Sequence, residues 1–353
     1  MAGSQTQDRI PMQDWKIAHR SDVLHGLRKP QSNPIATQLI LSDLCNQDCW
    51  YCAYRMSGYP SNHSFYTGSE LVPLDGIQPR NPKRQMSTPK AMEILEDLQA
   101  MSVESVEFTG GGEPTIHPDF ARIVQDARSR NLEVGVVTNG LKLTEAILEA
   151  MDGISWVRVS IDSPNPATYA RIRRTGEGAL ARVLTNLGKI RSRHLGVSFI
   201  VTTENYRQIS QFRELIQTIN PNIQVRFGDM WGTDPQYYTP EMLQVIQDQL
   251  TPQEFRYFQG RKGNQFTSPW YSTCWQQRIN TYIGANLHVY RCCHYAYNPQ
   301  GLLGSLETQR FRELWQSLHL QEFDASTCNS CPFHTKNTFI QYLLSDAQHT
   351  EFL

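Results

Sequence analysis

The sequence predicts an α/β protein with a partial, TIM-like (β/α)6 barrel and a small C-terminal α+β domain that carries a cysteine cluster. Six short runs of β-branched or apolar residues recur between residues 37 and 227, separated by segments with helical spacing. Strand–helix units in series require parallel strands joined by right-handed crossovers. The series ends after six units, short of the eight that close a barrel. Five of the eight cysteines lie from residue 274 onward.

Each strand–helix unit is visible in the local pattern of the chain. The first helix is well marked, because Ser87 or Thr88 can cap it and Pro89 fits its first turn. Ligands of such barrels bind at the carboxyl ends of the strands, where the polar motifs of this chain fall. The expected strands are 37–41, 105–109, 133–138, 156–161, 197–202 and 223–227, and the expected helices are 89–101, 118–130, 144–151, 166–193 and 206–218.

Four regions are expected along the chain. The polar first segment lacks a repeating pattern and predicts an arm with one short helix. A long insertion at 53–85, rich in Gly, Pro, Ser and Tyr, interrupts the barrel, and an active-site lid is preferred over disorder. The regions are the arm 1–33, the barrel 34–230, a linker 231–268 with a helix at 240–249, and the cysteine-bearing module 269–353.

Composition excludes several classes of partner. The chain has 353 residues, enough for one large domain and a smaller one, and 39% of them are hydrophobic. A formal net charge of -1 provides no overall basic field for nucleic acid. No run of about 18 apolar residues predicts a membrane span. The first twenty residues lack the apolar stretch of a secretory signal, so the expected location is the cytoplasm.

The cysteines are clustered in a way that indicates metal binding. They occupy positions 45, 49, 52, 274, 292, 293, 328 and 331. Disulfide frameworks belong mostly to small secreted chains, which makes them a poor explanation here. Clustered thiols in a reducing compartment indicate iron or zinc instead.

The segment LSDLCNQDCWYCAYR places Cys45, Cys49 and Cys52 as C-x3-C-x2-C directly after the first strand. Three thiolates on one loop can bind three corners of an iron–sulfur cube, whereas electron-transfer clusters are held by four cysteines. A zinc site is the alternative, but no fourth Cys or His has the required spacing. His63, for example, follows eleven residues after Cys52.

This motif resembles the hallmark of the radical S-adenosylmethionine (SAM) superfamily, and the resemblance covers about residues 34–230. It implies a [4Fe–4S] cluster on Cys45, Cys49 and Cys52. The open iron of that cluster would be chelated by the amino and carboxylate groups of SAM. An electron from the cluster would then break a C–S bond of SAM. The resemblance also places the aromatic ring of Tyr51 against the adenine.

The second strand ends in FTGGGEPTIHP, where glycines allow the backbone to approach a ligand closely. By itself this turn could also be a structural bend or a phosphate nest. In the radical SAM family the corresponding Gly-Gly-Glu meets the amino group of SAM. The resemblance therefore assigns Gly111, Gly112 and Glu113 to SAM binding.

Polar residues also follow the third and fourth strands, in VVTNG and WVRVSIDSP. The resemblance assigns Asn139, Ser160 and Asp162 to the ribose hydroxyls and the carboxylate of SAM, although Asn139 could equally cap a turn. Arg173 could pair with the same carboxylate in a bidentate way. The stretch 171–193 is basic, however, and most of its charges must lie on a solvated helix face.

A second cysteine group occupies the C-terminal module. Cys274 and Cys292 flank an expected hairpin with strands at 278–283 and 287–290. A turn and an amphipathic helix in LLGSLETQRFRELW then lead back to Cys328 and Cys331. Four thiolates would fully ligate a second [4Fe–4S] cluster, and a structural zinc ion with the same four ligands is the alternative.

This module resembles the twitch domain, the shortened form of the SPASM domain. The resemblance implies an auxiliary cluster with no open iron, which suits electron transfer. It favours Cys292 as the ligand, with Cys293 as a packed thiol or a substitute ligand. Family hairpins usually have glycine five residues before the second cysteine, where this chain has Leu287.

Together these features predict a radical SAM iron–sulfur oxidoreductase that needs an external reductant such as flavodoxin or ferredoxin. A 5′-deoxyadenosyl radical would abstract a substrate hydrogen atom, and the auxiliary cluster would relay an electron as the substrate is oxidised or rearranged. An arm too short for a leader-binding domain, a single auxiliary cluster and the absence of a basic field favour a small polar metabolite. Modification of a peptide or protein side chain is the alternative substrate reading.

An alternative of another class is a non-catalytic iron–sulfur or zinc protein. The Gly111–Glu113 and Ser160–Asp162 elements would serve no purpose in such a protein, so the enzyme is preferred.

Overall fold

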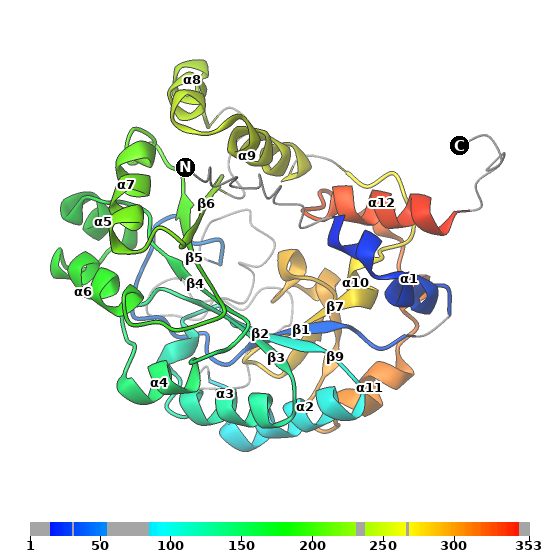
Figure 1. The fold of residues 1–353 in the computed structure, drawn as a ribbon. Helices are drawn as coiled ribbons and strands as arrows, with labels where there is room; N and C mark the ends of the chain where they lie inside the picture. The colour runs from blue at the N-terminus through cyan, green and yellow to red at the C-terminus, as the bar shows by residue number, and fades with distance from the viewer. Residues whose placement is uncertain (1–14, 30–31, 55–84, 231–236, 266–267, 346–353) are drawn as a thin grey trace, which may run out of the picture.

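A computed structural model describes residues 15–29, 32–54, 85–230, 237–265 and 268–345. Within these residues nine strands form one sheet, in the order β6-β5-β4-β3-β2-β1-β7-β8-β9. Figure 1 shows the sheet curving around a central axis with helices on its outer side. Most of the expected lid, 53–85, lies outside the described residues.

The first six strands pair in parallel with their sequence neighbours, which confirms the predicted α/β fold class with its partial barrel. The strand boundaries differ from the predicted ones mainly at the fifth strand, which begins three residues earlier than expected. The strands are β1 (Ala36–Ile40), β2 (Ser105–Thr109), β3 (Glu133–Thr138), β4 (Trp156–Ser160), β5 (His194–Ile200) and β6 (Gln224–Gly228).

Helices follow these strands on the outer side of the sheet. The helix expected over 166–193 is in fact two helices, because Arg174 adopts a left-handed conformation with φ of 48° and ends the first of them. The helices are α2 (Thr88–Ala100), α3 (Phe120–Ser129), α4 (Glu145–Ala150), α5 (Pro166–Arg173), α6 (Gly178–Leu187) and α7 (Ile209–Ile219), with the short η3 (Pro114–Ile116) after β2.

The two faces of the barrel strands differ in chemistry. Alternate residues such as Phe108, Val159 and Phe199 are fully buried in the hydrophobic core with the helices. The residues between them point to the other side of the sheet, since side chains alternate along a strand. That inner face carries polar side chains, among them Glu107 and Ser160, which are partly exposed.

Two helices follow β6 and cover the open edge of the barrel. The expected helix α8 (Pro240–Gln249) begins at Thr239, whose hydroxyl accepts a hydrogen bond from the Met242 amide. A second helix, α9 (Pro252–Gln265), was not predicted and contacts β6. Its Phe258 is fully buried in the core.

The C-terminal module continues the barrel sheet. Strand β7 pairs in parallel with β1, and the hairpin formed with β8 extends the sheet through β9. Residues 302–305, expected as a turn, form β9 because they pair with β8. The elements are α10 (Gln276–Ile279), β7 (Asn280–Ile283), β8 (His288–Tyr290), β9 (Leu302–Ser305), α11 (Phe311–Ser317) and α12 (His334–Leu344), with η4 (Cys293–Tyr295), η5 (Pro299–Gly301), η6 (Leu320–Glu322) and η7 (Ala325–Thr327) between them.

The conformation of this hairpin turn explains why twitch and SPASM hairpins usually have glycine at the position of Leu287. Leu287 has a φ of 63°, in the left-handed region that glycine enters at little cost. Its amide donates to the Gly284 carbonyl oxygen at 2.9 Å, which closes the turn. The leucine therefore keeps the turn geometry at some conformational cost.

The N-terminal segment folds onto the C-terminal helix. Within the described part of the expected arm lie η1 (Trp15–His19) and α1 (Ser21–Leu27), two helical segments where one short helix was expected. Ile17 and Leu27 form a small buried cluster with Ile340 of α12. No helix in the described ranges combines the length and apolarity needed to cross a membrane.

Candidate cluster and cofactor site

The three-cysteine loop follows β1 and is held by hydrogen bonds to α5, the helix that follows β4. The Asp48 amide donates to the Arg173 carbonyl oxygen at 3.1 Å, and the Trp50 amide donates to that of Ile172 at 3.3 Å. These bonds join the loop to the last turn of α5. The Cys45 residue as a whole is exposed, although protein atoms surround most of its thiol group, and Cys49 and Cys52 are half-buried.

The thiols of this loop are poised for a positively charged partner. Burial raises the pKa of Cys45 to about 11 and that of Cys52 to about 12. The charge of Cys49 contributes to both raised pKa values, which indicates that its sulfur lies near those of Cys45 and Cys52. Thiolates so close together and so poorly solvated need a cation to hold them ionised. An iron cluster bound here would provide that positive charge.

The glycine strip after β2 lies directly against the cysteine loop. The Gly112 amide donates to the Ser42 carbonyl oxygen at 3.0 Å, and the Glu113 amide donates to that of Leu44 at 2.8 Å. A β-carbon on Gly112 would lie 2.0 Å from the Leu44 oxygen, closer than atoms can approach. Glycine is therefore required for this backbone contact, and Gly111 beside it is buried.

Replacing Gly112 with alanine is expected to push the cysteine loop away from the glycine strip. We expect overpacking to cost about 1–3 kcal/mol of unfolding free energy and to lower the iron bound after anaerobic reconstitution. Gly178→Ala is the matched control, because nothing lies within 4 Å of a β-carbon there. Urea unfolding and iron analysis measure both quantities. Equal behaviour of the two variants would contradict the proposed contact.

Glu113 links the ends of β2 and β3. Its Oε1 accepts hydrogen bonds from the Thr115 amide, the Thr115 hydroxyl and the Thr138 hydroxyl, and its Oε2 accepts one from the Asn139 amide at 2.7 Å. Burial raises the pKa of this carboxyl group. A carboxylate has about four acceptor positions, so Oε2 can still accept a hydrogen bond from a ligand amine.

Asn139 and Ser160 stand at the ends of their strands as predicted. The Asn139 side-chain oxygen accepts from the Leu141 amide at 2.9 Å, so this residue does cap a turn. Its Nδ2 also donates to Asn46 at 2.6 Å, which connects β3 to the cysteine loop. Ser160 receives a hydrogen bond from the Ser198 hydroxyl at 3.3 Å, on the inner face of the barrel.

Asp162 and Arg173 face each other in the protein interior. Asp162 is fully buried, and its Oδ2 lies 2.5 Å from Nη2 of Arg173. The Tyr51 hydroxyl donates to the same carboxylate, and the Ile200 amide donates to its Oδ1 at 2.8 Å. Burial raises the pKa of Tyr51 well above its usual range, so the hydroxyl remains a donor.

Arg173 is thus unlike the rest of its basic stretch. It is 4% exposed, whereas the side chains of Arg171 and Arg174 are 60% and 55% exposed. The sequence suggested that Arg173 and Asp162 both reach SAM, but the structure makes them partners of each other. Their contact with SAM stays a prediction.

Two residues that form hydrogen bonds in this site were not predicted from the sequence. Gln47 accepts a hydrogen bond from Nη1 of Arg173 at 3.1 Å and donates one to the Tyr169 hydroxyl at 3.0 Å. Gln47 lies between Cys45 and Cys49, and its position inside the motif was the only available signal. Thr138 was also missed, although it ends the predicted third strand.

The four C-terminal thiols of Cys274, Cys292, Cys328 and Cys331 come from three separate segments, since the last two lie three residues apart. Burial raises the pKa of Cys274 to about 12 and that of Cys328 to about 11, and charge on Cys331 adds to both effects. Burial also raises the pKa of Cys292 well above its usual range, and charge on Cys274 acts in the same direction. The Tyr271 hydroxyl donates to the Cys331 sulfur at 3.5 Å.

The fifth cysteine of this region has a different setting. Cys293 packs against a buried cluster that contains Tyr290 and Tyr297. That packing agrees with the prediction that Cys293 is a packed thiol, although the choice of ligand stays a prediction.

Comparisons with known proteins identify two domain types in this chain. Residues 39–217, about half of the chain, match the model of the radical SAM superfamily, and residues 274–332 match SPASM, an iron–sulfur cluster-binding domain. The mycofactocin maturase MftC of Mycolicibacterium smegmatis is 27% identical over 322 residues, which are 84% of this chain and 75% of MftC.

Solved structures show the same fold. Streptococcus suis SuiB bound to its precursor peptide SuiA has a TM-score of 0.61 at 12% identity, and the match covers 98% of this chain and 82% of SuiB. The structure of anSMEcpe with bound AdoMet has a TM-score of 0.55 at 17% identity, over 82% of this chain and 83% of that protein.

Proposed function

This chain belongs to the radical SAM superfamily, and on that premise we propose that it uses a SAM-derived radical to modify a side chain of a peptide or protein. The barrel match and the SPASM match together make the chain a radical SAM enzyme of the SPASM type. The identity of the substrate is the proposed part.

The observation that carries the radical chemistry is the three-thiol loop packed against the glycine strip. Cys45, Cys49 and Cys52 provide three ligands from one loop, and the close contact of Gly112 with Leu44 holds the glycine strip against that loop. When bound, a reduced four-iron cluster supplies the electron that cleaves SAM to methionine and a 5′-deoxyadenosyl radical. The protein's task is to orient SAM and substrate and to exclude water.

Individual residues can be given roles in holding SAM. The free acceptor position on Oε2 of Glu113 suits the amino group of SAM, with the Gly111 and Gly112 backbone beside it. Asn139 and Ser160 offer polar groups at the barrel rim. Tyr51, Asp162 and Arg173 form a buried network next to Cys49, and in this proposal they position the loop and its ligand.

The auxiliary module supports the redox part of the proposal. Cys274, Cys292, Cys328 and Cys331 would hold a second [4Fe–4S] cluster with no open iron, which suits electron transfer. The electron that starts the reaction would come from an external reductant such as flavodoxin or ferredoxin.

A peptide substrate replaces the small metabolite that the sequence favoured. The similarity to MftC, a maturase, extends over most of this chain. The fold shared with SuiB is one that accommodates a precursor peptide in that protein. The amino-acid composition and the net charge could not indicate a peptide substrate, because both are properties of the whole chain and do not describe the barrel interior.

Deuterium transfer tests the substrate class. The reconstituted enzyme would be reduced with SAM and each peptide encoded beside its gene, prepared with perdeuterated amino acids. We expect deuterium in 5′-deoxyadenosine, as shown by mass spectrometry, and a mass change in one peptide. The Cys45→Ala, Cys49→Ala, Cys52→Ala variant is the control and should give neither signal.

The same assay includes deuterated cyclitols and sugars. Transfer from one of these compounds, with none from any peptide, would overturn the peptide proposal and restore the metabolite reading.

A further inference from the structure

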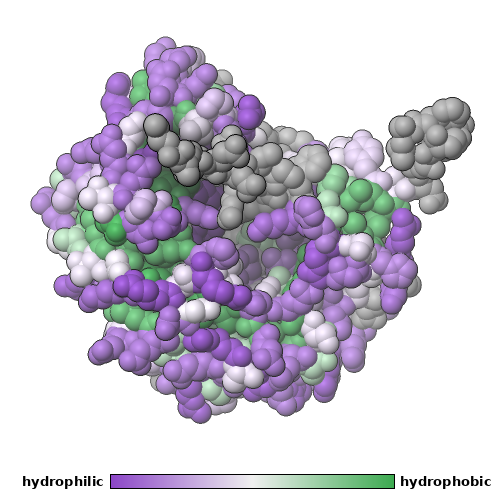
Figure 2. Space-filling view, in the orientation of Figure 1, coloured by the Kyte–Doolittle hydropathy of each residue, from purple (hydrophilic) through white to green (hydrophobic). Residues whose placement is uncertain are grey.

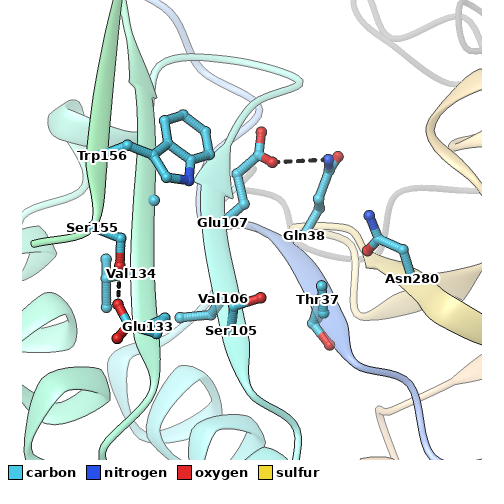
Figure 3. Close-up of a pocket in the computed structure, with 12 residues that line it drawn as sticks. Thr37, Gln38, Ser105, Val106, Glu107, Glu133, Val134, Ser155, Trp156 and Asn280 are labelled. Carbon is cyan, nitrogen blue, oxygen red and sulfur yellow. Dashed lines mark hydrogen bonds between the residues drawn. The ribbon is translucent and has the colours of Figure 1, made fainter. Parts of the chain in front are cut away.

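The C-terminal module places two of its cysteines near the amino end of β7. Asn280, the first residue of β7, lies beside Thr37 of β1, as Figure 3 shows. Cys274 comes just before the short helix α10 that leads into β7. Strand β8 runs antiparallel to β7 and ends at Tyr290, so the chain returns to the same end before it reaches Cys292. Both cysteines therefore lie toward the end of the sheet opposite to the three-cysteine loop, which follows the carboxyl end of the parallel strand β1.

Cys331 is a common neighbour of the other three proposed ligands in this module. Burial is the largest cause of the raised pKa values of Cys274, Cys292 and Cys328, and charge on Cys331 acts in the same direction on all three. Such mutual influence places the four thiols around one centre. Four thiols around one centre are the ligand set of a fully ligated four-iron cluster.

Tyr271 provides one hydrogen bond to the Cys331 sulfur. Its hydroxyl donates at 3.5 Å, and the residue is 3% exposed. The phenol ring stacks on the His334 imidazole with 5.6 Å between the ring centroids. It also packs edge-on against the Trp270 indole, with 5.7 Å between centroids. These ring contacts hold the hydroxyl in the direction of the sulfur.

Asn337 provides a second hydrogen bond to the same sulfur, from α12. Its Nδ2 donates to the Cys331 sulfur at 3.6 Å, and its side chain is fully buried. Its Oδ1 accepts a hydrogen bond from the Gln276 amide at 2.8 Å, which directs Nδ2 toward the sulfur. Gln276 lies two residues after Cys274, so this one side chain connects two of the proposed ligand segments.

Hydrophobic surface lies over these two donors. Figure 2 shows hydrophobic residues at the surface over α12, where Leu343 is exposed. The Tyr342 ring is 6.0 Å from the exposed Trp270 ring, which in turn contacts Tyr271. Because Tyr271 and Asn337 are both buried beneath this surface, water does not compete for their hydrogen bonds to sulfur.

Hydrogen bonds to a ligand sulfur stabilise the reduced form of an iron–sulfur cluster. Reduction adds one electron, and part of the added negative charge lies on the sulfurs. A donor therefore interacts more strongly with the reduced cluster than with the oxidised one. Such hydrogen bonds are among the factors that set the reduction potential of a cluster.

We infer that Tyr271 and Asn337 are positioning residues that raise the reduction potential of the auxiliary cluster through the Cys331 sulfur. A raised potential makes the oxidised cluster a better acceptor of one electron, as the relay of an electron from a substrate radical requires. This inference rests on the proposed function for the presence of the auxiliary cluster.

A redox titration of the auxiliary cluster tests this inference. The full chain carrying Cys45→Ala, Cys49→Ala and Cys52→Ala would be reconstituted anaerobically, and the reduced auxiliary cluster would be followed by EPR spectroscopy. In this parent chain we expect Tyr271→Phe to lower the ratio of reduced to oxidised cluster at a fixed potential by about three- to tenfold. That change corresponds to a midpoint potential about 28–59 mV lower for a one-electron couple. Asn337→Leu should lower the midpoint potential as well.

Tyr342→Phe is the matched control, because it removes the same hydroxyl group from a ring of α12 that is 65% exposed. It should leave the midpoint potential unchanged. Tyr271→Phe keeps the ring that packs against His334 and Trp270, so its iron content and unfolding midpoint should equal those of the parent chain. A midpoint potential that stays the same or rises in Tyr271→Phe, at full iron loading, would overturn the inference.

Iron content separates failure of this inference from failure of the proposed function. A parent chain that binds about four irons, with a potential that does not respond to Tyr271→Phe, overturns the inference and leaves the proposed auxiliary cluster in place. A parent chain that binds no iron defeats the proposed auxiliary cluster itself, and the inference with it.

Discussion

Replacing Cys45, Cys49 and Cys52 together with alanine is expected to abolish 5′-deoxyadenosine formation and to leave about four irons per chain. The first loss follows because the three thiols of this loop are the only proposed ligands of the SAM-binding cluster. The remaining iron follows because Cys274, Cys292, Cys328 and Cys331 come from other segments, buried around a different centre. Iron analysis and chromatography measure the two outcomes.

Cys293→Ala is the matched control for this experiment. Cys293 packs beside Tyr290 rather than at a proposed ligand position, so its replacement should leave both the iron content and the activity in place. A triple variant that retains no iron would show that the C-terminal module binds zinc or no metal. A triple variant that still forms 5′-deoxyadenosine would refute the assignment of the loop.

Asp162→Asn is expected to destabilise the protein by about 3–5 kcal/mol, the cost of leaving a buried charge without its partner. Asp162 is fully buried and Arg173 is 4% exposed, so water cannot replace the lost carboxylate. The same change weakens the hydrogen bond from Tyr51. Urea unfolding of the metal-free protein measures the loss.

An exposed ion pair provides the control for this prediction. Asp22 pairs with Arg20 at 2.7 Å, but its side chain is 66% exposed. Asp22→Asn should therefore cost less than about 1 kcal/mol. If the two variants lose similar amounts of stability, the pair of Asp162 and Arg173 is not the buried anchor described here.

Local sequence patterns were sufficient for the barrel but not for the contacts between distant segments. The strands were predictable because their apolar runs are short and separated by helical spacing. The pairing of β7 with β1 joins residues more than two hundred positions apart, and no local pattern encodes it. The break after α5 was missed because Arg174, not glycine, adopts the left-handed conformation that ends that helix.

In the candidate site, too, local motifs were predictable from the sequence and contacts between distant segments were not. The spacing of Cys45, Cys49 and Cys52 identified the chemistry, since ligand number and order along the chain are sequence properties. Arg173 was more difficult, because a basic helix normally faces solvent and the carboxylate that holds this residue inside lies on another strand.

The central claim is that this chain cleaves SAM reductively at the Cys45, Cys49 and Cys52 loop. Its most direct test is chromatography for 5′-deoxyadenosine after anaerobic reconstitution with iron and sulfide and reduction with dithionite. With SAM present, the wild-type enzyme should form 5′-deoxyadenosine and methionine in equal amounts. No 5′-deoxyadenosine at full iron loading would contradict the claim.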